Sequence, residues 1–580
     1  MSTKQKLELN WIGKHKRPRL EPRILLEDKS LSYGDADSEN LLIHGDNLLA
    51  LKALEQKYAG KVKCIYIDPP FNTGQAFELY DDGLEHSLWL TLMRQRLEIL
   101  YSLLSEDGLF WIHLDDSEVH YLKVVLDEVF GREHFVSHIS YERSSAAGIG
   151  QGGFIVDTSE HILLYKKSII SQHEIKNSIP LDLKTIKRYN KSLKSFKGKR
   201  LVREFISKSN GKPVRVYEYD EFEVQTISLK DYDKRKTEID LALADNFETL
   251  FRTNQIQKEN SFQRDLVDGM DKSKLYSVEY TPSRGKYQDQ LTELFYLNAE
   301  LFSWLKDTAT LEPEGIVKHS NLTNFWRHED IPKADIANEG GVKFPRGKKP
   351  EQLLKRIIEI STKPGDLVLD SFGGSGTTGA TAHKLKRRWI MIELGEHCHT
   401  HIAPRLRKVV NGEDQGGISK SVDWKGGGGF RYLRLAPSLL KKDSWGNWVI
   451  NKEYNAEMLA EAMCKHMNFT YAPSQTQYWN HGYSTEADYI YVTTGSLAYE
   501  QLKVISEEVG TERTLLICCK AFMTEGADFP NLTLVKIPRA ILSKCEWDQD
   551  DYSFTLNVLS DTEQPDDIEY DEDTEGEELL

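Results

Sequence analysis

Few cysteines and no long apolar run occur in this sequence of 580 residues. Its six cysteines include no Cys-x-x-Cys pair, which argues against a structural zinc site and favours a reducing environment. No apolar run approaches the roughly 18 residues that cross a bilayer. The opening MSTKQKLELNW also lacks the apolar core of a signal peptide. We therefore expect a cytoplasmic protein with no membrane partner and no bound metal.

Acidic residues outnumber basic ones, since the net charge is −15. The basic residues are unevenly distributed along the chain. The last twenty residues hold eleven acids and no base, whereas residues 181–220 carry twelve Lys or Arg against four acids. A solvated helix face and a polyanion-binding surface both fit this basic stretch, in which aromatic residues are interleaved. For DNA, the candidate contacts are Lys187, Arg188, Lys191, Lys197, Lys199 and Arg200.

The order of apolar runs along the chain predicts two halves of one α/β sheet with an insertion between them. Short continuous apolar runs such as LLIH, CIYI and LVLD are typical of buried parallel strands. The predicted parts are a basic arm at 1–40, one half at 41–170, the insertion at 171–335, the other half at 336–438, a small α/β domain at 439–560 and an acidic disordered tail at 561–580.

A glycine-rich turn, VLDSFGGSGTTGATA, connects a predicted strand to a predicted helix at residues 368–382. Gly374 and Gly376 let the backbone approach a ligand closely. About twenty residues later a second strand ends on Glu393, whose carboxylate suits the two hydroxyls of a ribose. No Gly-Lys-Ser or Gly-Lys-Thr is present to bind a triphosphate. The turn therefore predicts a nucleoside cofactor without phosphates, and S-adenosylmethionine meets that description.

A buried strand that ends on Asp68-Pro69-Pro70-Phe71 is the second motif. This tetrapeptide resembles the catalytic motif of amino-group DNA methyltransferases, and DSFGGSG resembles their S-adenosylmethionine motif. The catalytic motif comes first by about 300 residues, which is the order of the β class. GKKPEQLLKRII at 347–358 and His44-Gly45-Asp46-Asn47 resemble further parts of the cofactor site in this class.

The resemblance implies an α/β, Rossmann-like fold dependent on S-adenosylmethionine, with circularly permuted motifs and a target-recognition domain in the insertion. It implies Asp68, Pro69, Pro70 and Phe71 as catalytic residues. For the cofactor it implies Asp46, Asn72, Lys349, Pro350, Asp370, Phe372, Gly374, Gly376, Thr377 and Glu393. Two departures from the family pattern are Phe71, where Tyr is commoner, and the sequence just before Lys349.

The implied reaction is methylation of adenine N6 in DNA. Asp68 and the Pro69 carbonyl would accept the two amine hydrogens, and Phe71 would stack on a base flipped out of the duplex. The opening LELNWIGKHKRPRLEPRILLED and the IHLDDSE stretch resemble the modification (Mod) subunits of type III restriction–modification systems, which act in phage defence. That resemblance implies double-stranded DNA, a homodimer and a helicase–nuclease (Res-type) subunit as partners. Methylation of cytosine N4 and a stand-alone methyltransferase remain the alternatives.

Overall fold

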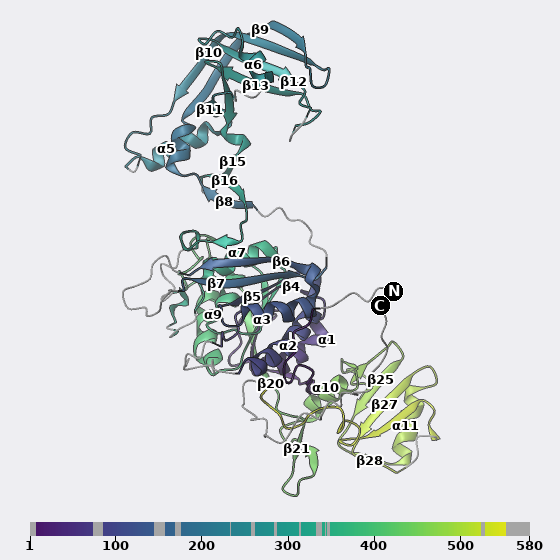
Figure 1. The fold of residues 1–580 in the computed structure, drawn as a ribbon. Coiled ribbons are helices and arrows are strands. Elements are labelled where there is room, and N and C mark those ends of the chain that lie inside the picture. The colour runs from purple at the N-terminus through teal and green to yellow at the C-terminus, as the bar shows by residue number, and fades with distance from the viewer. Residues whose placement is uncertain are drawn as a thin grey trace, which may run out of the picture. The chain divides into compact units, whose positions relative to one another are not determined.

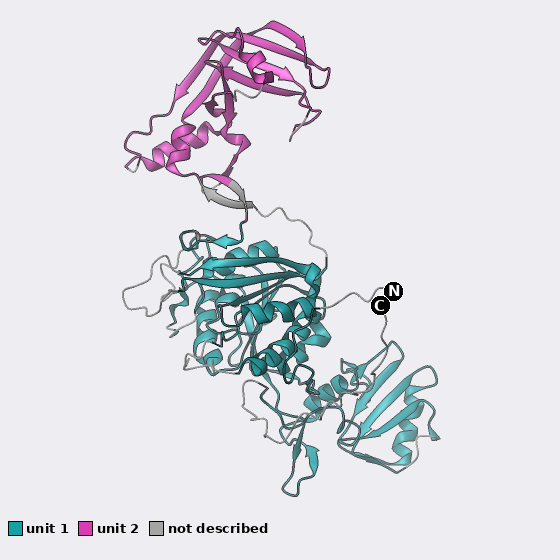
Figure 2. Ribbon diagram, in the orientation of Figure 1, with its two compact units in different colours: residues 1–173, 323–580 teal, residues 174–322 magenta. Residues whose placement is uncertain are grey.

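The computed structural model describes residues 7–72, 85–143, 157–168, 176–232, 234–256, 261–283, 287–312, 315–331, 339–342, 344, 348–523 and 528–552. The chain divides into two compact units, which are coloured separately in Figure 2. Residues 1–173 and 323–580 form the first unit, and residues 174–322 form the second. The second unit is thus an insertion within the first, at a place close to the predicted 171–335.

An eleven-stranded sheet is the centre of the first unit, in the order β1-β20-β3-β19-β18-β4-β5-β7-β6-β17 with β2 paired to β20 (Figure 1). The strands are β1 Leu25–Glu27, β2 Tyr33–Gly34, β3 Leu41–His44, β4 Val62–Ile67, β5 Leu104–Leu114, β6 Phe135–Glu142, β7 Ser159–Lys166, β17 Phe325–Trp326, β18 Leu367–Asp370, β19 Arg388–Glu393 and β20 Gly429–Leu435. The stretch from β20 to β5 is parallel, whereas β7 pairs antiparallel with both β5 and β6.

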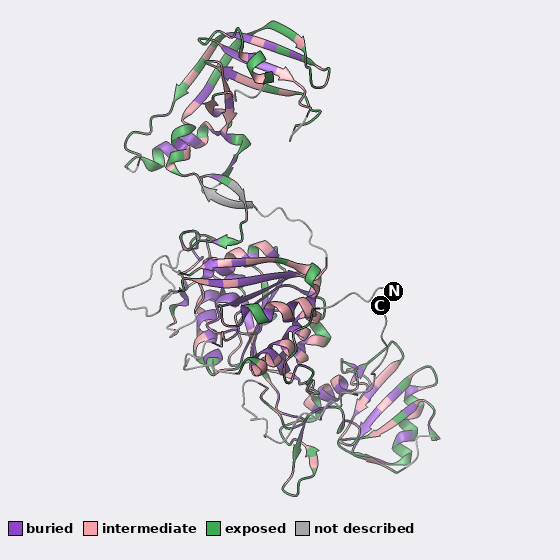
Figure 3. Cartoon of the chain, viewed as in Figure 1, coloured by how far each residue is buried: buried purple, intermediate pink, exposed green. Residues whose placement is uncertain are grey.

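Helices cover both faces of this sheet, because its central strands are apolar on both sides (Figure 3). On β4, Ile65 and Ile67 pack with α1 to α3, while Cys64 and Tyr66 pack with α7 to α9. The helices are α1 Asn47–Tyr58, α2 His86–Leu103, α3 Val119–Leu126, α7 Glu351–Ser361, α8 Thr377–Lys384 and α9 Ala403–Val410. A π-helical turn extends α3 (η1, Asp127–Gly131) and another precedes α9 (η7, Cys398–Ile402).

The two predicted halves meet where β18 pairs with β4, and Leu369 lies opposite Ile65 in the parallel register. The residues that follow these two strands therefore leave the same edge of the sheet. In an open α/β sheet, ligands bind at that carboxyl edge, where the strand order reverses. The chain thus has the predicted Rossmann-like α/β fold. Strands from the second predicted half pair with strands from the first half in one sheet.

The second unit contains a closed antiparallel barrel in the order β10-β12-β13-β14-β11-β9. Its strands are β9 Lys191–Ile206, β10 Pro213–Thr226, β11 Leu250–Asn254, β12 Leu275–Tyr280, β13 Thr292–Leu297 and β14 Glu300–Trp304. Around it lie α4 Leu183–Arg188, α5 Lys236–Asp245, α6 Ser261–Val267 and a sheet of β8 Lys176–Pro180, β15 Ala309–Glu312 and β16 Gly315–Asn321. The helix-face interpretation of the basic stretch is wrong for residues 191–206, because they form β9.

A smaller α/β lobe occupies the C-terminal part of the first unit. Its five-stranded sheet consists of β23 Thr470–Tyr471, β24 Gly482–Tyr483, β25 Asp488–Val492, β27 Thr514–Cys519 and β29 Leu532–Lys536. The lobe also has α10 Ala456–His466, α11 Tyr499–Val509, the pair β21 Leu440–Lys442 and β22 Trp448–Ile450, and the pair β26 Ser496–Leu497 and β28 Ala521–Phe522. Cys518 and Cys519 are both buried at the end of β27.

The basic segment near the N-terminus packs against the first unit over its described residues. Strand β1 pairs antiparallel with β20, and Arg23 donates to the Ala436 carbonyl at 2.8 Å and the Gln549 carbonyl at 2.9 Å. Lys14 is buried, with its ammonium 3.1 Å from Glu128. Over the part of the chain that the structure describes, no helix is both long and apolar enough to span a bilayer.

Candidate active site

Asp68, Pro69, Pro70 and Phe71 directly follow β4, at the carboxyl edge of the sheet. Asp370 ends the neighbouring strand β18 and begins the glycine turn. Two motifs that are about 300 residues apart in the sequence thus leave adjacent parallel strands at the same edge. Their arrangement follows from the parallel pairing of β18 with β4, and it places the predicted catalytic and cofactor residues in one site.

Charged and polar groups surround the Asp68 carboxylate. Lys349 Nζ lies 3.3 Å from Asp68 Oδ1 and 3.3 Å from Glu160 Oε2. His113 Nε2 lies 2.7 Å from the same Glu160 oxygen. Burial raises the pKa of Asp68, although the Lys349 ammonium and His113 act in the opposite direction. The site therefore presents two carboxylates, one ammonium and one imidazole around the end of β4.

Phe71 and the prolines are held by neighbouring side chains. Trp89 Nε1 donates to the Pro70 carbonyl at 3.0 Å, which fixes the backbone of the motif. The Phe71 ring is half-buried, with Lys349 Nζ 4.5 Å from its centroid and the His113 ring 6.1 Å away. Asn72 has a positive φ of 61° and donates to Glu118 Oε1 at 2.6 Å. The loop at 73–84 lies outside the described residues.

The glycine turn is held to β19 by Glu393. The Gly374 N–H donates to Glu393 Oε2 at 2.7 Å, and the Gly395 N–H donates to Oε1 at 3.0 Å. Burial would raise the pKa of Glu393, but the hydrogen bond and charge of His397 and these backbone donors outweigh burial and lower it. Gly376 has φ +78°, and a Cβ there would lie 2.8 Å from Ile402. A side chain at that position would thus force the turn against the neighbouring helix.

Asp370 and Thr377 fix the two ends of the turn. Asp370 accepts from the Phe372 N–H at 2.9 Å and from Thr378 Oγ1 at 2.5 Å. Burial raises the pKa of Asp370 to about 8. Thr377 Oγ1 accepts from Arg405 at 2.8 Å. Phe372 is half-buried against the core on the α1 to α3 side.

The Asp46 carboxylate caps α1. Its Oδ1 accepts from the Leu49 N–H at 3.0 Å, its Oδ2 accepts from the Tyr552 N–H at 3.2 Å, and the Arg96 guanidinium lies 3.6 Å away. Asn47 donates to the Ser371 carbonyl at 2.8 Å and so connects α1 to the glycine turn. The predicted role of Asp46 in cofactor binding stays a prediction, since the described contacts of this acid are within the protein.

The basic candidates on the barrel differ in their surroundings. Lys199 lies 2.7 Å from Glu279 and 2.9 Å from Glu293, and these acids raise its pKa despite partial desolvation. Arg200 lies 2.9 Å from Glu218, so two of the candidates have their charge offset by acids of the barrel itself. The other four candidates lie on two elements. Lys187 and Arg188 are exposed in the last turn of α4, Lys191 is half-buried in β9, and Lys197 is exposed in β9.

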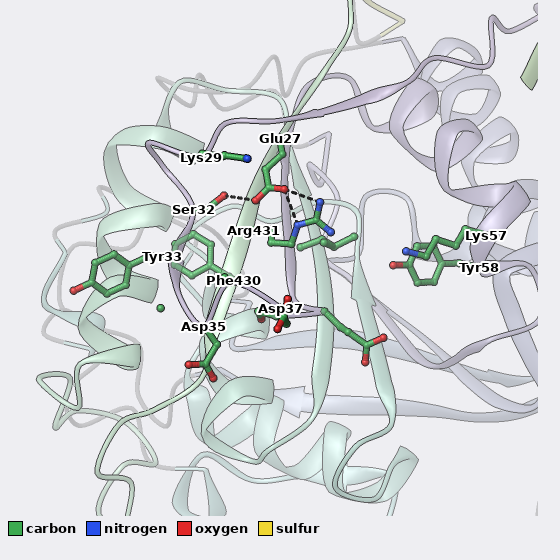
Figure 4. A pocket seen from close by; sticks show the side chains of 15 residues that line it. Glu27, Lys29, Ser32, Tyr33, Asp35, Asp37, Lys57, Tyr58, Phe430 and Arg431 are labelled. Carbon is green, nitrogen blue, oxygen red and sulfur yellow. Dashed lines mark hydrogen bonds and ion pairs between the residues drawn. The ribbon is translucent and has the colours of Figure 1, made fainter. Parts of the chain in front are cut away.

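A cavity of about 720 Å³ lies elsewhere, at the amino end of β3 (Figure 4). Figure 4 shows Glu27 and Arg431 pointing toward each other across it, and their closest atoms are 2.7 Å apart. Its lining also includes the acids Asp35 and Asp37 and the apolar side chains of Leu41 and Phe430. Because Asp68 follows the carboxyl end of β4 and Glu393 is the last residue of β19, this cavity is separate from the candidate active site.

Several residues of the site escaped sequence reasoning. Glu160 is the second residue of β7, and His113 lies in β5, which pairs antiparallel with β7. Glu118 also contacts Asn72, and Arg96 lies beside Asp46. His113 lies in the IHLDDSE stretch that resembles the Mod subunits, but nothing in that stretch marks the histidine as part of the site. Nothing in the spacing of Glu160 signals its place beside Lys349.

Comparison with known proteins identifies the family. The N6/N4 DNA methylase family matches residues 62–404, which is more than half of the chain. The probable type III restriction–modification enzyme HindVI Mod subunit of Haemophilus influenzae is 36% identical over 69% of this chain and 54% of its own length. The EcoPI Mod subunit of Escherichia phage P1 is 28% identical over 70% of this chain and 65% of its own length. The chain thus spans between half and two thirds of these relatives. It belongs to the N6/N4 DNA methylase family.

Proposed function

We propose that the chain is a DNA adenine N6-methyltransferase that uses S-adenosylmethionine. The observation that carries the proposal is the adjacency of Asp68-Pro69-Pro70-Phe71 and the glycine turn at the ends of β4 and β18. A methyl acceptor held at the first motif would lie beside a cofactor held at the second. Membership of the N6/N4 DNA methylase family supports the same reaction class.

The residues of the turn fit a cationic nucleoside cofactor. Glu393 accepts backbone hydrogen bonds at Oε2 and at Oε1 and a further one from His397. A carboxylate has about four lone-pair sites, so a ribose hydroxyl would share an oxygen with these donors. No lysine of a P-loop is present to hold phosphates. When bound, S-adenosylmethionine supplies a methyl group on a sulfonium centre.

Asp68 prepares the target amine for methyl transfer. The exocyclic amine of adenine is a poor nucleophile, because its lone pair is delocalised into the ring. Hydrogen bonds from this amine to Asp68 and to the Pro69 carbonyl draw the nitrogen toward a tetrahedral geometry and free the lone pair. The two prolines and the bond from Trp89 to the Pro70 carbonyl hold the acceptors in place beforehand. Phe71 offers a ring face to a base flipped out of the duplex.

Methylation of cytosine N4 is the alternative on the same scaffold. Cytosine also has an exocyclic amine that two acceptors could hold, and the family name covers both reactions. Asp68 at the first position of the motif favours adenine. The identity of the methylated nucleoside separates the two.

We also propose that the chain is the modification and specificity subunit of a type III-like restriction–modification or phage-defence system. Its relatives are named as Mod subunits of type III enzymes. In this proposal the barrel unit recognises the target, the chain forms a homodimer on double-stranded DNA, and a Res-type helicase–nuclease subunit is its partner. Co-purification from the native cell and the mass of the purified protein test these partners. A monomer without a partner would favour the stand-alone alternative.

Transfer of labelled methyl groups to DNA tests the proposed function. Purified protein is incubated with methyl-labelled S-adenosylmethionine and DNA from a methylation-deficient host, and labelled sites are mapped by sequencing. Incorporation at adenines within one sequence context is expected. Lack of incorporation into any DNA, with cofactor binding intact, would overturn the proposal.

A further inference from the structure

Four ionisable side chains meet at the end of β4: Asp68, His113, Glu160 and Lys349. Lys349 precedes α7, while Glu160 and His113 come from the antiparallel pair β7 and β5. The Lys349 side chain is 12% exposed and that of Glu160 is 7% exposed. The Asp68 side chain is 19% exposed, so a half-buried and a buried carboxylate share one ammonium.

Lys349 is bound unequally to its two partners. Its ammonium donates a hydrogen bond to Glu160 Oε2 at 3.3 Å. Toward Asp68 Oδ1 it makes an ion pair at 3.3 Å without hydrogen-bond geometry. Asp68 Oδ1 is buried and accepts no hydrogen bond from the described residues. This oxygen therefore has an unused acceptor site, and a buried acceptor without a donor is costly.

Lys349 also covers the face of Phe71, with Nζ 4.5 Å from the ring centroid. The ammonium thus lies next to both groups that are proposed to receive the target base, the carboxylate and the aromatic ring. A base that stacks on this face of Phe71 and donates to Asp68 needs the space of the Lys349 ammonium.

Glu160 is oriented to receive this ammonium. The Tyr66 hydroxyl contacts His113 Nδ1 at 3.1 Å, and His113 Nε2 lies 2.7 Å from Glu160 Oε2 without the alignment of a hydrogen bond. Burial lowers the pKa of His113, which favours its neutral form. Burial would raise the pKa of Glu160, but Lys349 and His113 outweigh burial and lower it well below the ordinary value. Glu160 is accordingly a fixed, ionised acceptor.

We propose that Lys349 is a positioning residue shared between Asp68 and Glu160. Before the base arrives, the Lys349 ammonium keeps Asp68 ionised. Once the target amine has replaced this ammonium at Asp68, Glu160 alone holds Lys349. This proposal rests on the proposed methyltransferase function. No covalent bond is made or broken in the exchange. Lys349 acts through Asp68 rather than on the transferred methyl group.

The charges around Asp68 make the proposal testable by pH. Asp68 acts as a carboxylate, so transfer is lost as pH falls through its pKa. Lys349 and His113 favour the ionised form, whereas burial and the charge of Glu160 oppose it. Further groups face Asp68 or Glu160: Asp370, Tyr66, Tyr141, and Arg143 at 3.5 Å from Glu160. Loss of Lys349 should therefore move the acid limb of the pH–rate profile to higher pH. Loss of Glu160 should move it to lower pH.

The experiment compares single-turnover methyl transfer from pH 5 to 9 by the wild type, Lys349→Met, Lys349→Arg and Glu160→Gln. Lys355→Met on α7 is the control, because Lys355 contacts Ser421 away from the site. We expect the acid limb of Lys349→Met to rise by about one pH unit or more, that of Glu160→Gln to fall, and Lys349→Arg to restore the wild-type position. Glu160→Gln should also flip the base less well, read from 2-aminopurine fluorescence at the mapped target.

The outcomes separate this proposal from the function on which it rests. Acid limbs that move in opposite directions support it, because a purely structural defect lowers the rate at every pH alike. Unmoved limbs, or a shift in the same direction for both variants, in an active wild type would overturn the role of Lys349 and leave the function standing. No transfer by the wild type on any DNA would overturn both. If Lys349→Met does not fold, the comparison of Glu160→Gln, whose acid limb should fall, with Lys349→Arg, whose acid limb should keep the wild-type position, decides.

Discussion

The Gly374 N–H donates to Glu393 Oε2 at 2.7 Å, across 19 residues of sequence. This bond joins the glycine turn after β18 to the end of β19, two neighbouring parallel strands. The acid thus shapes the turn, and in the proposed function it also accepts a hydrogen bond from the ribose. Both functions depend on its negative charge, which the His397 contact at 3.1 Å supports.

Glu393→Ala is therefore expected to weaken S-adenosylmethionine binding. Loss of charge-assisted hydrogen bonds, each worth about 1.5–3 kcal/mol, predicts an affinity lower by about 10- to 100-fold. Titration calorimetry measures the affinity. The matched control is Glu396→Ala, which removes an exposed acid three residues away. Equal affinity in both variants would show that Glu393 does not bind the cofactor.

Asp68→Ala should separate binding from transfer. The amine then loses one of its two acceptors, so the rate of transfer should fall by at least about 100-fold. Cofactor affinity should stay near that of the wild type, since Glu393 and the turn are unchanged. Single-turnover kinetics and calorimetry on the same preparation give the two values. Near-normal turnover by this variant is incompatible with the mechanism.

Arg405→Met should destabilise the first unit. Arg405 is fully buried, pairs with Glu351 at 2.9 Å and donates to the Ser375 carbonyl at 3.0 Å. Its removal leaves the remaining charges of Glu351, Asp414 and Lys384 unbalanced in the interior. Loss of one partner from a buried pair costs about 3–5 kcal/mol. Denaturant unfolding gives the change in free energy of unfolding.

Arg407→Met is the control for this prediction. Arg407 lies on the same helix α9, is half-buried, and donates to two backbone carbonyls at 3.4 Å. We expect its effect to stay under about 1 kcal/mol, as for most substitutions near a surface. Similar losses in the two variants would count against the role of the buried network in holding the turn.

The C-terminal lobe should lose stability in acid because of His466. Burial, with the positive charges of Lys544 and Arg23, lowers the pKa of His466 to about 3. Its unfolded pKa is near 6.5, so the unfolded state binds more protons below that pH and stability falls as pH drops from about 6.5 to 3. The full loss is on the order of 5 kcal/mol, of which about 2 kcal/mol falls above pH 5. Amide hydrogen exchange of α10 peptides at pH 7 and 5 measures this part.

His466→Leu tests whether this histidine is the cause. The variant cannot become charged, so its α10 peptides should show a smaller increase in opening between pH 7 and 5, after correction for intrinsic exchange rates. His399→Leu, which replaces an exposed histidine, is the control. If both variants remain as acid-sensitive as the wild type, another group is responsible.

The fold of the first unit could be predicted because its strands are buried on both faces. Ile65, Ile67, Cys64 and Tyr66 are all apolar enough to pack under helices, so β4 reads as one continuous run. The motif order then placed Asp68 and the glycine turn in a single site, and the structure has them on adjacent strands.

The remaining contacts of the site depend on strand pairings that the pattern of apolar residues in the sequence does not reveal. Glu160 reaches Lys349 only because β7 turns back antiparallel along β5. Strand β9 escaped prediction because residues 194–204 are exposed on both of its faces, so no period of two is visible. The long-range contact between Tyr552 and Asp46 likewise has no local signal.

The measurement that tests the central claim most directly is nucleoside mass spectrometry of methyl-free DNA after incubation with the protein and S-adenosylmethionine. The site built from Asp68 to Phe71 and Glu393 predicts N6-methyladenine, absent when Asp68→Ala replaces the wild type. N4-methylcytosine in its place would contradict the adenine assignment while keeping the amine chemistry. A digest with no methylated base, from DNA of varied sequence, would contradict the account as a whole.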